Sequence, residues 1–326
     1  MPSSSTPSAR PPRSAGSTCT PRRARSAAPS TAFRGSTPPT GWVYNKDVWA
    51  KAGITDWPKT PAEFLADLQA IKDRTDAIPY YTNYKDGWPL TAWTSVLGSP
   101  SCDAKAGDAL ATSTDPWATG GDLNVGDSLL FDIVNKKLSE EDPTTTNWED
   151  SKGQLATGKI AGMWLGSWAI VQMRDAAEKA GKDPSVIGYM PFPAQVNGKF
   201  CSMVTPDYLY SVNVHSKNKA AAHAWLRWML DESGFADANQ AISSVRGAPL
   251  PTALKPFGDA GVQLVELSQV KAGQVNAIDN ASEVGLNKPD YRQRLIDVAR
   301  GAAPGDAKSV FAELTTRWAD AVKMGG

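Results

Sequence analysis

A tryptophan at the end of an apolar run is the residue whose position most strongly suggests ligand chemistry. Residues 160–165 predict a short strand, Gly166 and Ser167 predict a turn, and Trp168 stands on the first turn of the helix that follows. Ser167 is expected to cap that helix, because its hydroxyl can accept a free amide proton. Open α/β sheets bind ligands where strand gives way to helix. Trp168 is therefore predicted either to offer an aromatic platform beside free N–H groups or to fill the core.

Two loops contain further candidate ligand contacts. Asn83 and Trp88 lie in a loop that follows the strand predicted at residues 78–81. Side chains at the carboxyl end of a strand are well placed to reach a ligand. Asp207 follows another predicted strand, and its carboxylate can accept hydrogen bonds from hydroxyl groups, although a role in a turn explains it equally well.

Residues that would carry catalysis are sparse. The two histidines, His215 and His223, have a spacing that matches no zinc motif, and the chain has no Cys-x-x-Cys pair. The acidic run at residues 140–142 is expected to form a solvated surface, whereas a glycosidase needs two carboxylates facing each other across a sugar. The sequence shows no nucleophile elbow and no phosphate-binding glycine loop. We therefore expect no enzyme, no cofactor and no metal, with a glycan-processing enzyme as the main alternative.

The composition favours recognition of a small molecule over binding to nucleic acid. The chain has 12 tryptophans, and carbohydrate sites are built from flat aromatic rings that stack on the C–H faces of sugars. Beyond residue 40 there are 28 basic and 34 acidic residues, and this mildly negative charge argues against a polyanionic partner. No run approaches the roughly 18 apolar residues that span a membrane. Cys102 and Cys201 can be a disulfide or two reduced thiols, and the sequence leaves both open.

The first forty residues differ from the rest in composition. Pro, Ser, Thr and Ala fill 29 of these positions and Arg six, while Asp, Glu and Lys are absent. Such a segment cannot bury enough apolar surface to offset its ordering entropy, so residues 1–40 are predicted to be disordered. They contain no continuous apolar stretch typical of a signal peptide. A leader translated from a shifted reading frame and a genuine disordered tail are the two interpretations.

A second motif lies near the start of the patterned sequence. Tyr-Asn-Lys-Asp at residues 44–47 is followed by a helix start, in which Thr60 is the N-cap, Pro61 occupies the first helical position and Glu63 supplies a capping-box carboxylate. Together with Gly-Ser-Trp at residues 166–168, this pairing resembles the extracellular solute-binding proteins of ABC importers. The most similar class is the carbohydrate binders that include maltose-binding protein.

The resemblance implies a function and a partner. The protein would bind a mono- or oligosaccharide outside the cytoplasm, as a monomeric lipoprotein, and deliver it to an ABC permease in the membrane. In that family the tryptophan of the Gly-Ser-Trp motif stacks on the sugar, which gives this role to Trp168. An aromatic ligand residue precedes a Trp-Pro-Leu like that at residues 88–90, which makes Tyr84 a candidate. Arg246 lies in a segment that approaches the cleft in family members, with a surface arginine as the alternative. A polyol or a glycerol-phosphate derivative remains a possible ligand.

The pattern of elements predicts an α/β fold, because strands alternate with helices. The resemblance implies the two-lobed, type II fold of periplasmic binding proteins. On that pattern residues 41–211 form the second lobe, 212–260 a fragment of the first lobe, and 261–326 a helical tail packed on the second lobe, with a helix near 262–267. Most of the first lobe would be missing, and sugar binding by this chain is expected to be impaired. Further strands are predicted at residues 187–190 and 209–214.

Overall fold

A three-stranded antiparallel sheet forms the centre of the molecule. The computed structural model describes residues 33–245 and 247–325. Strand β2 (Thr40–Asn45) lies between β3 (Gly162–Gly166) and β4 (Ile187–Met190), and Trp42 pairs with both Trp164 and Met190. Successive side chains of a strand point to opposite faces of the sheet. Trp42 accordingly packs into one core cluster and Val43 into another.

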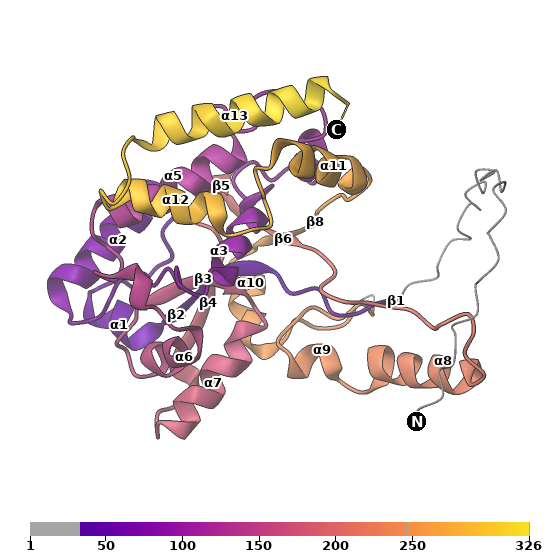
Figure 1. The fold of residues 1–326 in the computed structure, drawn as a ribbon. Helices are drawn as coiled ribbons and strands as arrows, with labels where there is room; N and C mark the ends of the chain where they lie inside the picture. Colours follow the sequence, from indigo (N-terminus) through magenta and orange to yellow (C-terminus); the bar gives the residue numbers. More distant parts are fainter. Residues whose placement is uncertain (1–32, 246, 326) are drawn as a thin grey trace, which may run out of the picture.

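Helices cover both faces of this central sheet, as Figure 1 shows. The cluster that contains Trp42 includes residues of α1 (Lys46–Lys51), α2 (Pro61–Arg74) and α5 (Asp122–Asn135). The cluster that contains Val43 includes residues of α6 (Trp148–Ala156), α7 (Ala169–Lys179) and α10 (Lys255–Asp259). Burial on both faces explains why β3 is apolar throughout and has no exposed residue. Shorter elements connect these helices: α3 (Trp88–Thr91), η1 (Ala92–Val96), α4 (Ala106–Ala109), η2 (Pro143–Thr145), η3 (Pro184–Val186) and η5 (Thr252–Leu254).

Helix ends follow the signals in the sequence. Thr60 caps α2 by accepting a hydrogen bond from the Glu63 amide, and Pro61 is the first helical residue, as predicted. Asn147 caps α6 in the same way. After α7 the chain turns at Gly181, whose φ of 66° lies in the left-handed region that glycine adopts without strain.

Three C-terminal helices form a layer: α11 (Ala272–Ser282), α12 (Asp290–Ala299) and α13 (Ala307–Lys323). Helices α12 and α13 pack on α5, and α11 packs on α13 and α4. A buried ion pair joins α12 to α5, with 3.0 Å between Arg292 Nε and Asp127 Oδ1. Trp117 also donates a hydrogen bond to Asp127, at 2.8 Å, so the buried carboxylate is well solvated by protein groups.

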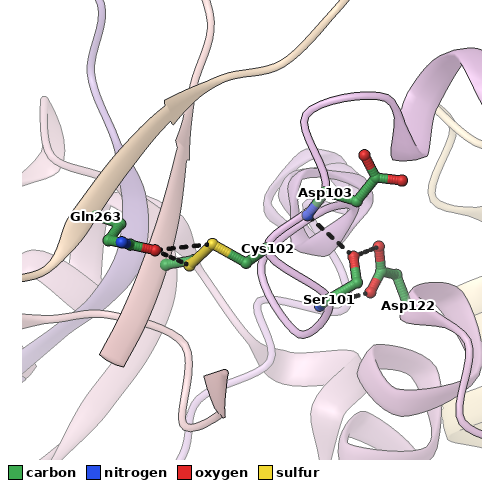
Figure 2. The surroundings of a disulfide bond; sticks show 6 residues. Ser101, Cys102, Asp103, Asp122 and Gln263 are labelled. Atoms are coloured by element: carbon green, nitrogen blue, oxygen red, sulfur yellow. Dashed lines mark hydrogen bonds between the residues drawn. A yellow bond between two sulfur atoms is a disulfide. The ribbon is translucent and has the colours of Figure 1, made fainter. Parts of the chain in front are cut away.

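A disulfide joins the loop before α4 to a second small sheet. Cys102 and Cys201 are bonded, with 5.4 Å between their Cα atoms, which resolves the alternative that the sequence left open. Cys201 belongs to β6 (Lys199–Val204), which pairs with β5 (Gln195–Val196) and, in parallel, with β8 (Gln263–Glu266). Figure 2 shows Gln263 beside the two sulfur atoms and Asp122 on the opposite side of the loop. Asp122 accepts hydrogen bonds from the Gly98 amide and the Ser101 side chain, which fixes the loop from that side.

Residues 205–250 form a separate region, which we call the arm. It contains β7 (Leu209–Tyr210), α8 (Lys219–Arg227), a π-helical turn η4 (Trp228–Glu232) and α9 (Phe235–Ala238). Among the described residues strand β7 pairs only with β1 (Phe33–Arg34), and α8 extends away from the central sheet (Figure 1). The rest of the described chain is called the body.

The structure differs from the sequence prediction in four places. Disorder was expected through residue 40, but residues 33–40 are extended and paired: Thr37 bridges Ile242 and Pro39 bridges Val204. The remainder of the predicted leader, residues 1–32, lies outside the described residues. The helix expected near residues 262–267 is strand β8, because a parallel partner, β6, is available to it. The strand expected at 78–81 makes only isolated bridges, and that at 209–214 is reduced to the two residues of β7.

The expected domain boundary near residue 260 also differs from the packing. Leu254 and Phe257 were assigned to the fragment of the first lobe, but both are buried in the body, in the cluster that contains Val43. Phe257 stacks on Tyr189 of β4, with 5.5 Å between ring centroids. Within the described residues no helix is both long and apolar enough to cross a membrane.

Candidate functional site

The turn between β3 and α7 fixes Trp168. The Ser167 amide donates a hydrogen bond to the Pro39 carbonyl at 2.9 Å, and the Ile170 amide donates to the Ser167 carbonyl at 3.0 Å. Trp168 itself is the N-cap residue of α7, and no side chain caps this helix. The prediction that Ser167 caps the helix is therefore wrong, because its side chain is buried and its hydroxyl has no partner in the described structure.

Gly166 lets the Trp168 indole fold back against its own turn. A Cβ at position 166 would lie 2.6 Å from Cδ1 of Trp168, which is closer than real Cβ atoms approach. The absence of a side chain at Gly166 is thus a condition for the indole position, which is a physical reason for a glycine in the Gly-Ser-Trp motif.

Trp168 and Asp207 line the same pocket. It has a volume of about 480 Å³, which falls in the range of small-molecule sites. The body contributes one wall through the first turn of α7, and the arm contributes the other. The lining residues are Ser36, Pro38, Trp168, Val171, Gln172, Asp207, Tyr208, Phe235, Asn239 and Ala241. Two residues that the sequence separates by 39 positions are therefore brought together.

Asp207 is the charged member of this lining. Its amide donates a hydrogen bond to the Ser36 carbonyl at 3.1 Å, while its side chain has no hydrogen-bond or ion-pair partner among the described residues. Desolvation by the surrounding atoms raises the pKa of the Asp207 carboxyl. A carboxylate in this situation gains from a ligand that donates hydrogen bonds to it.

Three tryptophans gather beside the pocket, each at the start of a helix. Trp88 begins α3, Trp148 begins α6, and Trp168 precedes α7. The centroid of the Trp88 ring lies 4.8 Å from that of Trp148, edge to face, and 5.8 Å from that of Trp168. Trp88 has an exposed fraction of 39%, and the other two rings are partly buried. The candidate ligand contact Trp88 therefore lies beside Trp168.

Asp86 ties two of these helix starts together. Its carboxylate accepts a hydrogen bond from the Trp148 amide at 2.6 Å, and its carbonyl accepts one from the Trp88 amide at 2.8 Å. The neighbouring Lys85 amide donates to the Thr146 hydroxyl at 2.8 Å. The loop that carries Trp88 is therefore fastened along its length to the segment that carries Trp148.

Two other predicted contacts, Asn83 and Tyr84, are not brought to the pocket. Asn83 is 1% exposed and its amide lies 3.2 Å from the Met163 sulfur, so it is packed inside the body. Tyr84 points toward α12 and donates a hydrogen bond to Asp297 at 2.9 Å. The loop turns between these residues and Trp88, with Asn83 at φ 55° and Gly87 at φ 74°, which separates their directions. Arg246 lies outside the described residues.

Several residues of the site escaped the sequence prediction. Trp148, Gln172, Tyr208, Phe235 and Asn239 belong to the pocket or to the tryptophan group. For Trp148 a signal was present, since Asn147 marks a helix start that follows a loop, like the start beside Trp168. For the arm residues no local signal exists, because the contact depends on how the arm returns to the body.

The acidic run at residues 140–142 differs from the solvated surface that was expected. Glu140 is buried, and burial raises the pKa of its carboxyl to about 7. It accepts hydrogen bonds from the amide and the hydroxyl of Thr82. His215 and His223 are exposed, and the described residues contain no group of His, Cys, Asp and Glu that could hold a metal ion.

Comparisons with known proteins identify relatives of this chain. At 26% identity, 282 residues align with the diacetylchitobiose-binding protein DasA of Streptomyces coelicolor, which covers 85% of this chain and 63% of that protein. The chain thus spans less than two thirds of that relative. The structure of the manno-oligosaccharide-specific solute-binding protein BlMnBP2 of Bifidobacterium animalis, in complex with mannotriose, superposes with a TM-score of 0.82 at 30% identity, over 90% of this chain and 70% of that one.

A second protein of Bifidobacterium animalis, BlMnBP1 in complex with mannobiose, superposes with a TM-score of 0.81 at 33% identity over the same shares of the two chains. These likenesses show the type II fold of periplasmic binding proteins, as the resemblance implied. The model of the bacterial extracellular solute-binding protein family matches residues 29–234, which is more than half of the chain. The chain belongs to the bacterial extracellular solute-binding protein family.

Proposed function

We propose that this protein is the carbohydrate-binding component of an ABC importer, and that its sugar lies in the pocket between Trp168 and Asp207. The observation that carries the proposal is the shared pocket, in which an indole and an unpaired carboxylate line one space. An indole stacks on the C–H face of a sugar ring, while the carboxylate accepts hydrogen bonds from its hydroxyl groups. The named relatives bind diacetylchitobiose, mannotriose and mannobiose, which supports an oligosaccharide as the ligand.

The charge of the pocket favours a neutral sugar over a phosphorylated ligand. Its described lining contains no Lys, Arg or His, and its charged residue is the carboxylate of Asp207. A phosphate would meet this negative group without a compensating cation. The lining therefore argues against the glycerol-phosphate derivative that the sequence left open.

Binding without catalysis fits the same lining. Hydrolysis of a glycosidic bond uses two carboxylic groups on opposite sides of the bond. Asp207 is the one carboxylic side chain among the described residues of the pocket. The relatives are named as binding proteins, which supports the same function here. We therefore assign no bond-breaking step to this chain.

The family supports the wider assignment. We propose that the protein acts outside the cytoplasm as a monomer anchored through a lipid, and that closure around the sugar precedes delivery to a membrane permease. We further propose that the body without residues 33–38 corresponds to the second lobe and that the arm, together with residues 33–38, belongs to the first. The pocket would then lie between the two lobes.

Replacement of Trp168 tests the proposal. Trp168→Ala is expected to weaken binding of mannotriose or diacetylchitobiose at least fivefold, because loss of an aromatic stack costs about 1 kcal/mol or more. Isothermal titration calorimetry would give the dissociation constants. Trp225→Ala, which removes an exposed indole that does not line the pocket, is the matched control and should leave them unchanged. Equal affinities for the wild type and Trp168→Ala would contradict the proposed site.

A further inference from the structure

A second large cavity lies in the body, apart from the pocket at Trp168. Its volume of about 650 Å³ falls in the range of small-molecule sites. It lies where the C-terminal ends of α2, α5 and α12 meet the segment 139–143, and its described lining shares no residue with the pocket at Trp168. The lining contains acidic and basic side chains, together with the buried apolar residues Val134, Pro143 and Ala299. The function proposed above assigns no role to this second cavity.

The buried acidic residue of the second cavity is Glu140. It is 9% exposed, and it accepts hydrogen bonds from the Thr82 amide, at 3.0 Å, and from the Thr82 hydroxyl. None of the ion pairs among the described residues includes it. Glutamate is seldom buried without a cationic partner, and burial raises the pKa of this carboxyl to about 7. Above that pH Glu140 therefore carries a negative charge that no ion pair of the described residues balances.

Packing explains the side-chain oxygens of Glu140 but not its charge. Tyr80 bridges Ser139, and the hydrogen bonds from Thr82 to Glu140 continue this contact between the two segments. An amide oxygen would accept the same hydrogen bonds without the cost of desolvating a charge. The carboxylate therefore indicates a function for the charge, and the cavity that it lines is the place where a cationic group can approach it.

The basic side chains of the lining differ in how they are used. Lys72 donates a hydrogen bond to the Lys137 carbonyl at 2.9 Å, and Arg300 forms an ion pair with Asp297 at 2.8 Å. Lys137 is exposed, and its ammonium group has no hydrogen-bond or ion-pair partner among the described residues. Since Lys137 and Glu140 are not paired with each other, the lining presents two opposite charges at separate positions.

A ligand with a single charge fits this lining poorly. An ammonium group alone would pair with Glu140 but would be repelled by Lys137, and a carboxylate alone would be repelled by Glu140. A ligand with one such group at each end pairs with both residues. The methylene groups between its ends can then be buried against Val134 and Ala299.

We propose that the second cavity binds a small zwitterion of the ω-amino acid class, with its ammonium group on Glu140 and its carboxylate group on Lys137. Contact with the ammonium group favours the ionised form of Glu140 and offsets the cost of burying it. The proposal goes beyond sugar binding and does not depend on it, because the two linings are separate. The protein thus binds ligands of two chemical classes, one at Trp168 and one at Glu140.

The test compares three probes that differ in their end groups. Isothermal titration calorimetry with the full chain at about pH 8, where Glu140 is ionised, gives dissociation constants for 6-aminohexanoate, hexylamine and hexanoate. The wild type should bind 6-aminohexanoate about fivefold or more tightly than either singly charged probe. Equal affinities for the three probes, or no binding of 6-aminohexanoate, would overturn the proposal.

Two variants assign the two ends of the ligand. Glu140→Gln keeps an acceptor oxygen for Thr82 and should reduce the preference for 6-aminohexanoate over hexanoate to about one. Lys137→Gln, at an exposed position, should do the same to the preference over hexylamine. Both preferences are insensitive to partial misfolding, because loss of active protein affects the two probes of a pair equally. A preference that survives in either variant would contradict the assigned ion pair.

Matched controls make the same charge changes outside the second cavity. Glu178→Gln and Lys136→Gln replace exposed side chains that do not line it, and both should leave the two preferences unchanged. All four variants should bind mannotriose as the wild type does, because the pocket at Trp168 has its own lining. Mannotriose binding without binding of 6-aminohexanoate would overturn this proposal alone, whereas the reverse result would contradict the proposed function alone.

Discussion

The body and the arm use tryptophan in opposite ways. Trp42 and Trp164 pair across β2 and β3 and are 1% exposed, within an aromatic cluster that also contains Trp93 and Phe192. Trp225 and Trp228 in the arm are 55% and 52% exposed. Exposed apolar area of this kind marks a surface that another surface covers. The same residue type therefore builds a self-contained core in one region and stays largely exposed in the other.

The pocket lies where these two regions meet, and the comparison explains its properties. The body wall is rigid, since Trp168 follows a wholly buried strand and is held by backbone hydrogen bonds. The arm wall is weakly supported: of the described residues of the arm, only Leu226, Met229 and Ala241 are buried. Regions with few buried contacts open at low free-energy cost. A site with one fixed and one loosely held wall is suited to capture by closure.

The largest expected contrast comes from a matched pair of tryptophan replacements. Trp164→Ala should lower the free energy of unfolding by about 3–5 kcal/mol, because it leaves a cavity in a close-packed aromatic cluster and removes the hydrogen bond that the indole donates to the Ala92 carbonyl. Trp225→Ala should change it by about 0.5 kcal/mol or less. Urea denaturation followed by circular dichroism gives both values. Equal effects would mean that the arm is packed as tightly as the body.

Removal of the disulfide sharpens the comparison at the border of the two regions. Cys102 and Cys201 are 99 positions apart, and Cys201 lies in the strand that leads into the arm. Replacing both with serine should cost about 2–4 kcal/mol through the greater freedom of the unfolded chain. Hydrogen exchange should rise most in β6 and in the arm, and least in β2 and β3. An equal increase in hydrogen exchange throughout the chain would contradict the idea that this disulfide mainly stabilises the region where the body meets the arm.

A smaller effect on stability comes from the buried carboxyl of Glu140, a residue of the body. Burial raises the pKa of its carboxyl from an ordinary value of 4.5 to about 7 in the folded protein. The folded state therefore binds more protons than the unfolded state between these two values, so stability falls as pH rises from about 4.5 to 7 and then levels off. The total contribution is about 3 kcal/mol at most. Glu140→Gln should weaken this dependence of the free energy of unfolding on pH, measured by urea denaturation at several pH values. An unchanged dependence would assign it to other titratable groups.

Local signals in the sequence predicted much of the body. The N-caps Thr60 and Asn147, the stop at Gly181 and strand β4 at residues 187–190 all depend on neighbouring residues, and the structure confirms them. The helix expected near residues 262–267 is wrong, because its strand conformation depends on β6, more than fifty residues earlier. Local propensity cannot report a partner at that distance.

The site was predictable only where it depends on local signals in the sequence. The position of Trp168 and that of Asp207 follow from strand ends, and the structure brings both to one pocket. Asn83 and Tyr84 stand in a loop with the same signals as Trp88, yet the loop turns them toward Met163 and Asp297. The direction of each side chain depends on positive φ angles at Asn83 and Gly87, which the sequence around Asn83 does not reveal.

A crystal structure of the protein with bound mannotriose or diacetylchitobiose tests the central claim most directly. The account predicts a sugar ring stacked on the Trp168 indole, with a hydroxyl group within hydrogen-bonding distance of the Asp207 carboxylate. A sugar bound elsewhere would contradict it, for example in the pocket of about 650 Å³ that Glu141 and Arg300 line. In that case Trp168 would be a residue of the strand–helix junction and no more.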